Sequence, residues 1–101
     1  MRGFFNVAQA DCLEWMESIP DASVDLIITD PAYQNLNRHR SVGTTKRLTD
    51  WFPCILDEAY EALARHWFRI LKPDGAIYLF GDAYTQFYVA FPSMLRAGFR
   101  M

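Results

Sequence analysis

The sequence predicts an α/β fold, part of a doubly wound and mostly parallel sheet. Two short apolar runs, at 24–29 and 76–81, are typical of buried strands, and a long segment with helical periodicity lies between them. Alternating strands and helices indicate parallel pairing through crossover helices. The 101 residues suit one domain or part of one.

The first three elements are a strand, a helix and a strand. "FFNVAQ" (4–9) is short and apolar, so we expect a strand there. "DCLEWMESIP" places Leu13 and Met16 on one helical face, and Pro20 ends the helix. "VDLIIT" (24–29) is β-branched and almost wholly apolar, which predicts a strand buried on both faces of the sheet.

A polar and basic loop is expected over 34–49, followed by a helix of about 20 residues that Asp50 caps and "KPDG" ends. The core face of this helix is predicted from apolar residues at steps of three and four: Phe52, Leu56, Ala59, Leu63, Trp67 and Ile70. Pro53 fits its first turn.

"AIYLFG" (76–81) is expected to form a second buried strand, after which Asp82 begins another helix. Pro92 is expected to break or kink this helix, and "GFRM" resembles the start of a further strand. Asp11, Asp30 and Asp82 each follow a predicted strand. Ligands bind beyond the carboxyl ends of the strands in such sheets, so we expect these three carboxylates at one functional edge.

The composition of the chain restricts the classes of function that it can have. The formal net charge is -2, so the chain as a whole is not an electrostatic nucleic-acid binder, although a local basic patch is compatible with it. Cys12 and Cys54 fit neither a metal spacing nor a disulfide framework, which favours reduced thiols in a cytoplasmic protein. No apolar run approaches the roughly 18 residues of a membrane span, and the N-terminus does not read as a secretory signal.

"IITDPAYQ" (27–34) carries the strongest functional signal. Asp-Pro after a strand is common turn chemistry, because the acid caps local amides and the proline stops the ladder. Here, however, the strand before it is buried, Tyr33 follows close enough to line the same pocket, and a basic loop comes next.

"SVDLIITDPAYQ" resembles motif IV, (D/N/S)-P-P-(Y/F), of the S-adenosylmethionine-dependent amino DNA methyltransferases. The flanking "ADCLEWMES", "RHRSVGTTKRL", "ILKPDGAIYLF" and "AGFR" are similar to the permuted β-type members, in which the catalytic motif precedes the cofactor motif. The resemblance implies a Rossmann-like sheet, DNA methylation of the restriction-modification kind and S-adenosylmethionine as cofactor. Ala32 stands where the family has a second proline.

The resemblance also implies the role of each motif residue. The target base is flipped into a pocket, Tyr33 stacks on it, and the Asp30 carboxylate and the Pro31 carbonyl accept hydrogen bonds from its exocyclic amine. An acidic first residue favours adenine over cytosine. Cofactor contacts are implied for Asp11, Cys12 and Asp30; Asp11 also reads as a helix N-cap, and for Asp82 capping is the preferred reading.

The loop after the motif is basic. Arg38, Arg40, Lys46 and Arg47 give it a charge of +4, so the remainder of the chain carries -6. We expect this loop to contact DNA phosphates rather than to be only a solvated surface. The predicted contacts also include the hydroxyl and imidazole groups of His39, Thr44 and Thr45. His66, on the long helix, is expected to be structural.

One family feature is missing. The cofactor loop of the family resembles F-x-G-x-G, and no two of the five glycines here are separated by a single residue. We therefore expect residues 1–101 to be the catalytic portion of an incomplete domain, inactive alone and completed by a further segment or a partner subunit. Apolar faces left exposed would favour self-association.

Two alternatives remain open at the level of sequence. The same methyl transfer could act on cytosine, RNA or a protein amide. The chain could instead be a non-catalytic fragment that binds nucleic acid through its basic loop.

Overall fold

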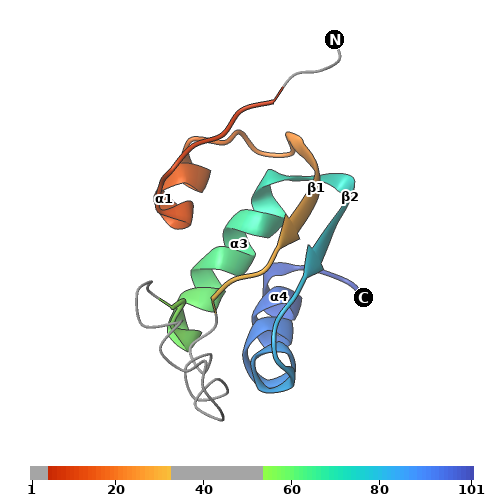
Figure 1. The fold of residues 1–101 in the computed structure, drawn as a ribbon. Coiled ribbons are helices and arrows are strands. Elements are labelled where there is room, and N and C mark those ends of the chain that lie inside the picture. The colour runs from red at the N-terminus through yellow and green to blue at the C-terminus, as the bar shows by residue number, and fades with distance from the viewer. Residues whose placement is uncertain (1–4, 33–53) are drawn as a thin grey trace.

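The computed structural model describes residues 5–32 and 54–101, in which helices pack against one face of a two-stranded parallel sheet (Figure 1). No helix in these ranges is both long and apolar enough to cross a membrane. The elements in chain order are α1 (Cys12–Glu17), β1 (Val24–Thr29), a 3₁₀ turn (Asp57–Ala59), α3 (Tyr60–Ile70), β2 (Leu71–Leu79), a π-helical segment (Thr85–Ala90) and α4 (Phe91–Ala97).

The two strands pair as predicted, in parallel, with α3 as the crossover element. Ile27 lies opposite Ile77 and Thr29 opposite Leu79. The strand β2 starts at Leu71, earlier than the sequence indicated, because Leu71 already pairs with Val24. The "KPDG" residues form an irregularity inside β2, where the register shifts, and not a separate turn.

In the described part of the chain, one face of the sheet is buried and the other is exposed. Val24, Ile27, Ile77 and Leu79 pack against a core that the helical residues Met16, Tyr60, Leu63, Ala64, Trp67, Ile70 and Ala90 provide. On the opposite face Ile28 is 64% exposed and Tyr78 59% exposed. The expectation of strands buried on both faces is therefore wrong for the described residues, because all the helices described there pack on the same side.

Both terminal strand predictions fail in the described part of the chain. Residues 5–9 and 99–101 are not in strands. A strand exists only with a ladder partner, and none of residues 5–10 makes a backbone hydrogen bond to another described residue. The apolar pattern of "FFNVAQ" gave an extended segment without pairing.

The long helix is shorter than predicted. Residues 54–56 are not helical, and α3 begins at Tyr60 after the 3₁₀ turn. The Ile55 N–H donates to the Ala32 carbonyl oxygen at 2.5 Å, which holds this stretch as extended chain beside the end of β1. Leu63, Trp67 and Ile70 are buried as predicted, whereas Leu56 is exposed. The predicted cap Asp50, Phe52 and Pro53 lie outside the described residues.

Pro92 does not break the last helix. The π-helical segment leads directly into α4, with Pro92 in the first turn of α4, where a missing N–H costs least. Gly98 ends α4 with a φ of 121°, and a β-carbon built there would lie 2.8 Å from the ring of Phe68. Glycine is therefore required at this C-cap for both conformation and space.

The guanidinium of Arg69 fastens the end of α1 and the following turn to α3. It donates to the carbonyl oxygens of Ile19 (2.8 Å) and Met16 (2.7 Å), and to Asp21 Oδ1 (2.7 Å). A further contact joins it to His66 Nδ1 at 3.2 Å, in line with a structural role for that histidine. Asp21 itself is mostly exposed, and exposed ion pairs stabilise little. The hydrogen bonds to the two carbonyl groups therefore provide most of the stabilisation between α3 and α1.

We expect Arg69→Lys to lower the free energy of unfolding by about 2 kcal/mol, because an ammonium cannot reach two carbonyls and a carboxylate in a fixed fork. Urea unfolding followed by circular dichroism measures this. Asp21→Asn is the matched control and should cost less than about 1 kcal/mol, because it removes only the exposed ion pair. Equal losses in the two variants would contradict the carbonyl account.

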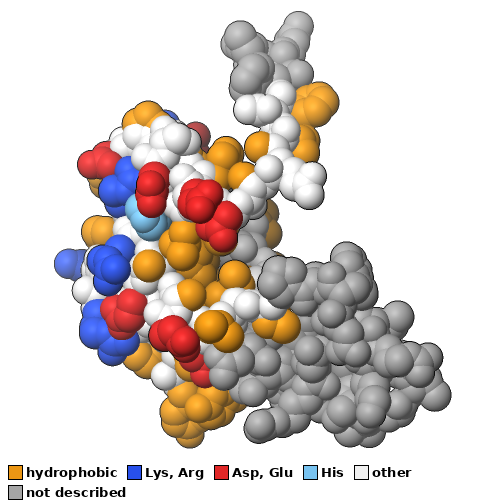
Figure 2. All heavy atoms as spheres, turned by 90° about the vertical axis from the view of Figure 1, so that its left-hand side faces the viewer, with side chains coloured by type: hydrophobic (Ala, Val, Ile, Leu, Met, Phe, Trp, Pro, Cys, Tyr) orange, Lys and Arg blue, Asp and Glu red, His pale blue; other side chains and the backbone are white. Residues whose placement is uncertain are grey.

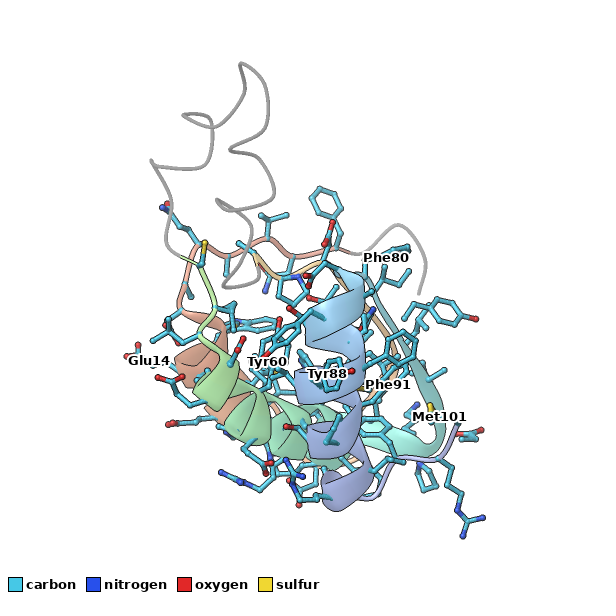
Figure 3. All side chains as sticks on the ribbon, turned by 90° about the horizontal axis from the view of Figure 1, so that it is seen from below. Glu14, Tyr60, Phe80, Tyr88, Phe91 and Met101 are labelled. Atoms are coloured by element: carbon cyan, nitrogen blue, oxygen red, sulfur yellow. The ribbon has the colours of Figure 1, made fainter. Side chains whose placement is uncertain are left out.

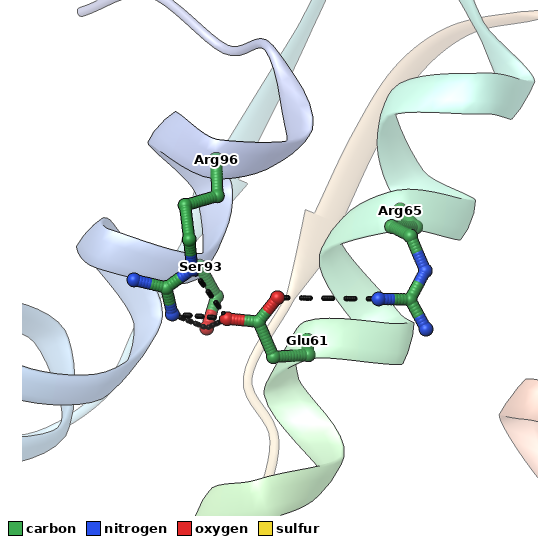
Figure 4. A network of polar contacts seen from close by, with 4 residues as sticks. All are labelled: Glu61, Arg65, Ser93 and Arg96. Atoms are coloured by element: carbon green, nitrogen blue, oxygen red, sulfur yellow. Dashed lines mark hydrogen bonds and ion pairs between the residues drawn. The ribbon is translucent and has the colours of Figure 1, made fainter.

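A second polar network joins α3 to α4 (Figure 4). The Glu61 carboxylate accepts hydrogen bonds from Arg96 and from the buried Ser93, and Arg65 lies 3.9 Å away on the same helix. These donors, with Arg96 first, hold the pKa of Glu61 below its usual range. The network helps to set the position of the helix that Asp82 begins.

Because the folded pKa of Glu61 is lowered, its contribution to stability is present at neutral pH and is lost as pH falls through the folded pKa, below the ordinary glutamate value of about 4.3. We expect Glu61→Gln to lower the Tm at about pH 7, and this difference to shrink as the pH falls below the ordinary glutamate value. Thermal melts of both proteins across this range measure it. A Tm difference that persists unchanged at acid pH would refute the assignment.

Candidate active site

The carboxyl ends of β1 and β2 lie side by side. The Phe80 N–H donates to the Thr29 carbonyl oxygen at 3.0 Å, one residue beyond the last pair of the ladder. Asp30 and Asp82 follow these neighbouring strand ends, so the prediction of three carboxylates after strands at one edge of the sheet is confirmed for these two. This is the edge where open α/β sheets place their ligands.

Among the described residues, one backbone hydrogen bond holds the turn after β1. Pro31 has no N–H, which ends the ladder, and Ala32 is tied to Ile55 by the hydrogen bond described above. Among the described residues no donor reaches the Pro31 carbonyl. Asp30 is exposed, while Pro31 and Ala32 are half-buried. The turn therefore offers two oxygen acceptors, the Asp30 carboxylate and the Pro31 carbonyl, in consecutive residues.

A cavity of about 470 Å³ lies beside this turn, between α1, the outer edge of β1 and α3. Its volume is within the range of small-molecule sites. Cys12 and Trp15 of α1 line it together with Thr29, Pro31 and Ala32. The structure thus brings the predicted cofactor residue Cys12 and the predicted catalytic residue Pro31 to one cavity, although they are far apart in sequence.

Asp11 lies at the same end of the molecule but does not follow a strand. Its carboxylate caps α1 by accepting from the N–H groups of Leu13 (3.0 Å) and Glu14 (3.2 Å), which confirms the N-cap reading. With Cys12 and Ile55 it lines a recess of about 290 Å³. Burial, followed by the charge of Asp11, raises the pKa of the Cys12 thiol, so this thiol stays protonated at neutral pH.

Asp82 also caps a helix, as expected. Its Oδ1 accepts from the Thr85 N–H at 3.2 Å, and its carbonyl accepts from the Gln86 N–H at 3.0 Å. The side chain of Gln86 donates in turn to the Leu79 carbonyl at 2.8 Å. These contacts fix the start of the last helix against the end of β2.

Tyr60 was not singled out from the sequence, yet it lies buried at the N-terminus of α3, with its ring edge-on to Trp67. Burial, then the charges of Asp57, Asp82 and Asp30, raise the pKa of its phenol to about 12. The hydroxyl therefore stays protonated at neutral pH and can donate a hydrogen bond near the edge of the sheet that carries Asp30 and Asp82. Its spacing of three and seven from Leu63 and Trp67 would have predicted the burial.

The rest of the predicted site lies outside the described residues. This covers the stacking residue Tyr33 and the predicted nucleic-acid contacts Arg38, His39, Arg40, Thr44, Thr45, Lys46 and Arg47. Their roles stay predictions.

Most of the described cations are already paired with carboxylates. Arg65 and Arg96 pair with Glu61, Arg69 with Asp21 and Lys72 with Asp25. Figure 2 shows basic and acidic side chains interspersed on the face that it presents. The described residues on this face therefore form no continuous basic surface for phosphates.

A second cavity, of about 560 Å³, borders the other side of β2. Phe80, Phe91 and Met101 line it, and Figure 3 shows these three residues along the same flank of the molecule. It lies away from the turn after β1, and its lining is mostly apolar.

Comparison with known proteins finds relatives that match this chain over about 70 residues. One stretch is 32% identical over 75 residues to the type II methyltransferase M.BamHI of Bacillus amyloliquefaciens, and covers 69% of this chain. Another is 35% identical over 71 residues to the type II methyltransferase M.HpaI of Haemophilus parainfluenzae, and covers 70% of this chain.

Both relatives are type II methyltransferases. The similarity supports the DNA methyltransferase resemblance, and the small parallel α/β domain is compatible with part of a Rossmann-like fold. The chain spans only 16% of the first relative and 21% of the second. No protein-family profile matches the chain, and no solved structure does.

Proposed function

We propose that this chain supplies the base-binding and catalytic part of an S-adenosylmethionine-dependent DNA methyltransferase that acts on the exocyclic amino group of adenine. The observation that carries the proposal is the position of the Asp30-Pro31 turn, which lies at the carboxyl edge of the sheet and beside a cavity of ligand size. The similarity to two type II methyltransferases supports it.

The chemistry follows from the acceptors at this turn. The lone pair of an aromatic amine is delocalised into the ring, which makes the amine a poor nucleophile. Two oxygen acceptors, Asp30 and the Pro31 carbonyl, hold the amine protons and direct the lone pair outward. The negative charge of the Asp30 carboxylate also stabilises the positive charge that develops on nitrogen during transfer.

The remaining rate acceleration comes from holding the base and the methyl donor in the correct relative position. The flipped base lies against Tyr33, whose ring face accepts any base by stacking, worth about 1–3 kcal/mol. Asp30 selects a base with an exocyclic amino group over one with a carbonyl at that position, because an ionised carboxylate accepts hydrogen bonds and cannot donate one to a carbonyl. Held in line with the methyl donor, the amine reacts without the entropy cost of encounter.

The described residues fit part of the cofactor. The 470 Å³ cavity is lined mainly by apolar side chains, which suits a flat purine, and carboxylates at the same edge suit a cation. Cys12 in this cavity, Asp11 in the neighbouring recess of about 290 Å³ and Asp30 at the end of β1 would hold S-adenosylmethionine. When bound, this cofactor supplies an electrophilic methyl group.

DNA contact is proposed for the basic residues within 38–47. The pairing of Arg65, Arg69, Lys72 and Arg96 with carboxylates leaves little uncompensated positive charge on the described surface. The +4 segment directly after the motif would then carry the phosphate contacts.

We further propose that the chain needs a glycine-rich cofactor loop from elsewhere for activity, because it has no Gly-x-Gly of its own. Calorimetric titration of S-adenosylmethionine tests this on the chain and on a form continued downstream to the next encoded Gly-x-Gly. We expect binding by the continued form only. Tight binding by the short chain would show that the loop is dispensable.

Substrate assays separate the remaining alternatives. A radiolabelled methyl group is offered to the continued form with DNA, RNA or protein as acceptor. Transfer to DNA alone supports the proposal. DNA binding without any transfer would favour the non-catalytic reading, and transfer to RNA or protein would move the same chemistry to another substrate.

A further inference from the structure

The two cysteines of the chain line the same recess. Cys12 is the first residue of α1, and Cys54 lies in the extended stretch that precedes the 3₁₀ turn. Both border the recess of about 290 Å³ described above. The fold therefore brings together two thiols that lie far apart in the sequence.

Both thiols are free, and solvent reaches the pair. Cys12 is exposed and Cys54 is half-buried. Among the described residues, no group of three or more His, Cys, Asp and Glu side chains is arranged to hold a metal ion. Two free thiols at one recess can instead undergo exchange with a disulfide, in which a thiolate attacks a disulfide sulfur and a mixed disulfide forms first.

The recess is connected to the turn after β1 through both of its cysteines. Cys12 also lines the cavity of about 470 Å³, together with Pro31 and Ala32. Cys54 precedes Ile55, whose N–H donates to the Ala32 carbonyl oxygen. A bond between the two sulfurs would add a covalent link to this hydrogen bond. In the sequence, the link would enclose the whole Asp-Pro motif and the basic loop after it.

We propose that Cys12 and Cys54 are a redox-sensitive thiol pair, which a small-molecule disulfide such as oxidised glutathione converts into an intramolecular disulfide. One cysteine thiolate attacks the glutathione disulfide, forms a mixed disulfide and releases a first glutathione thiolate. The second cysteine thiolate attacks the protein sulfur of the mixed disulfide and releases the other glutathione thiolate. The two cysteine protons pass to the released glutathione, and the two electrons lost by the protein reduce one glutathione disulfide to two thiols.

The surroundings of Cys12 set the rate of this exchange. Burial and the charge of Asp11 raise the pKa of its thiol, and Glu58 of the 3₁₀ turn is the other carboxylate that lines the recess. A protonated thiol is not the nucleophile, so attack by Cys12 is slow at neutral pH and becomes faster as the pH rises. A sulfur of raised pKa is also a poor leaving group, so reductants should attack the bond at Cys12 and release Cys54.

Glutathione buffers of increasing oxidised-to-reduced ratio test the pairing in the full chain, at about pH 8.5, close to the ordinary pKa of cysteine. After acid quenching, mass spectrometry separates the reduced chain, the mixed disulfides and the intramolecular disulfide. We expect the intramolecular disulfide to be favoured at least about tenfold more in the folded chain than in the chain unfolded in urea, because the fold raises the effective concentration of one thiol at the other. An equal or smaller preference in the folded chain, or mixed disulfides that never resolve, would overturn the proposal.

Single-cysteine variants are the matched controls. Cys12→Ser and Cys54→Ser each keep one thiol, so each should stop at the mixed disulfide. The comparison of folded with unfolded chain needs neither variant, so it still decides the question if one of them does not fold. A disulfide-linked dimer as the main oxidised product of the wild type, seen on a non-reducing gel, would also contradict the intramolecular pair.

Amide hydrogen exchange tests the link to the turn after β1. In the oxidised chain we expect exchange of the Ile55 N–H to slow at least about tenfold relative to the reduced chain. The Phe80 N–H, which donates to the Thr29 carbonyl oxygen and does not border the recess, is the internal control and should slow less. Equal changes at the two amides, or none at Ile55, would show that the bridge does not fasten the turn. These tests use no activity, so their outcome is independent of the methyltransferase proposal.

Discussion

Replacing Asp30 by alanine is expected to lower kcat for DNA methylation by about 100- to 1,000-fold in the form that carries the cofactor loop. Removal of one preorganised polar group at the reacting centre typically costs this much. Asp30 is exposed and follows β1, so its loss should leave the free energy of unfolding nearly unchanged. Asp30→Asn keeps one oxygen acceptor and should lose less activity than alanine. Single-turnover methylation rates and thermal melts of both variants measure these effects.

Asp74→Ala is the matched control for Asp30. Asp74 is an exposed aspartate in the irregular first part of β2, before the regular ladder, and no described residue pairs with it. It should retain full activity. Equal losses at Asp30 and Asp74, or a loss at Asp30 that follows a fall in Tm, would remove the chemical role assigned to the carboxylate.

Replacing Trp67 by alanine is expected to have the largest effect on stability, about 3–5 kcal/mol. Trp67 is 4% exposed in the C-terminal half of α3, its ring centroid lies 6.5 Å from that of Tyr60, and it borders the cavity beside β1. Small domains are stable by only about 5–15 kcal/mol, and this core faces one side of a two-stranded sheet. Chemical unfolding followed by circular dichroism should show a variant near or beyond its midpoint without denaturant.

The neighbouring Phe68 provides the comparison for Trp67. It is 46% exposed, and its ring meets that of Phe99 at a centroid distance of 5.2 Å. Phe68→Ala should cost about 1 kcal/mol. If both variants lost the same stability, burial on the inner face of α3 would not explain the effect.

Local signals in the sequence predicted the elements that need few distant contacts. Asp11 and Pro20 bracket the short helix α1, and "VDLIIT" forms β1 with the residues expected. The parallel pairing of β1 with β2 followed from the helix between them. The edge carrying Asp30 and Asp82 was predicted for the same reason, because parallel strands end together.

The failures concern features that distant partners decide. "FFNVAQ" has a strand pattern, but a strand also needs a neighbour with free N–H and C=O groups, which the pattern cannot supply. The apolar run 24–29 predicted two buried faces, and within residues 5–32 and 54–101 only the side with helices is buried. Leu56 fits the helical period, yet Ile55 pairs with Ala32, far away in sequence, and keeps the stretch extended. The proximity of Cys12 to Pro31 likewise depends on how α1 packs on α3.

Identification of the methylated base tests the central claim most directly. Unmethylated DNA is incubated with S-adenosylmethionine and with the form continued downstream to the next encoded Gly-x-Gly, then digested to nucleosides and separated by mass. We predict N6-methyladenine as the product, with none formed by Asp30→Ala. Methylcytosine as the product, or N6-methyladenine at an equal rate from Asp30→Ala, would contradict the account.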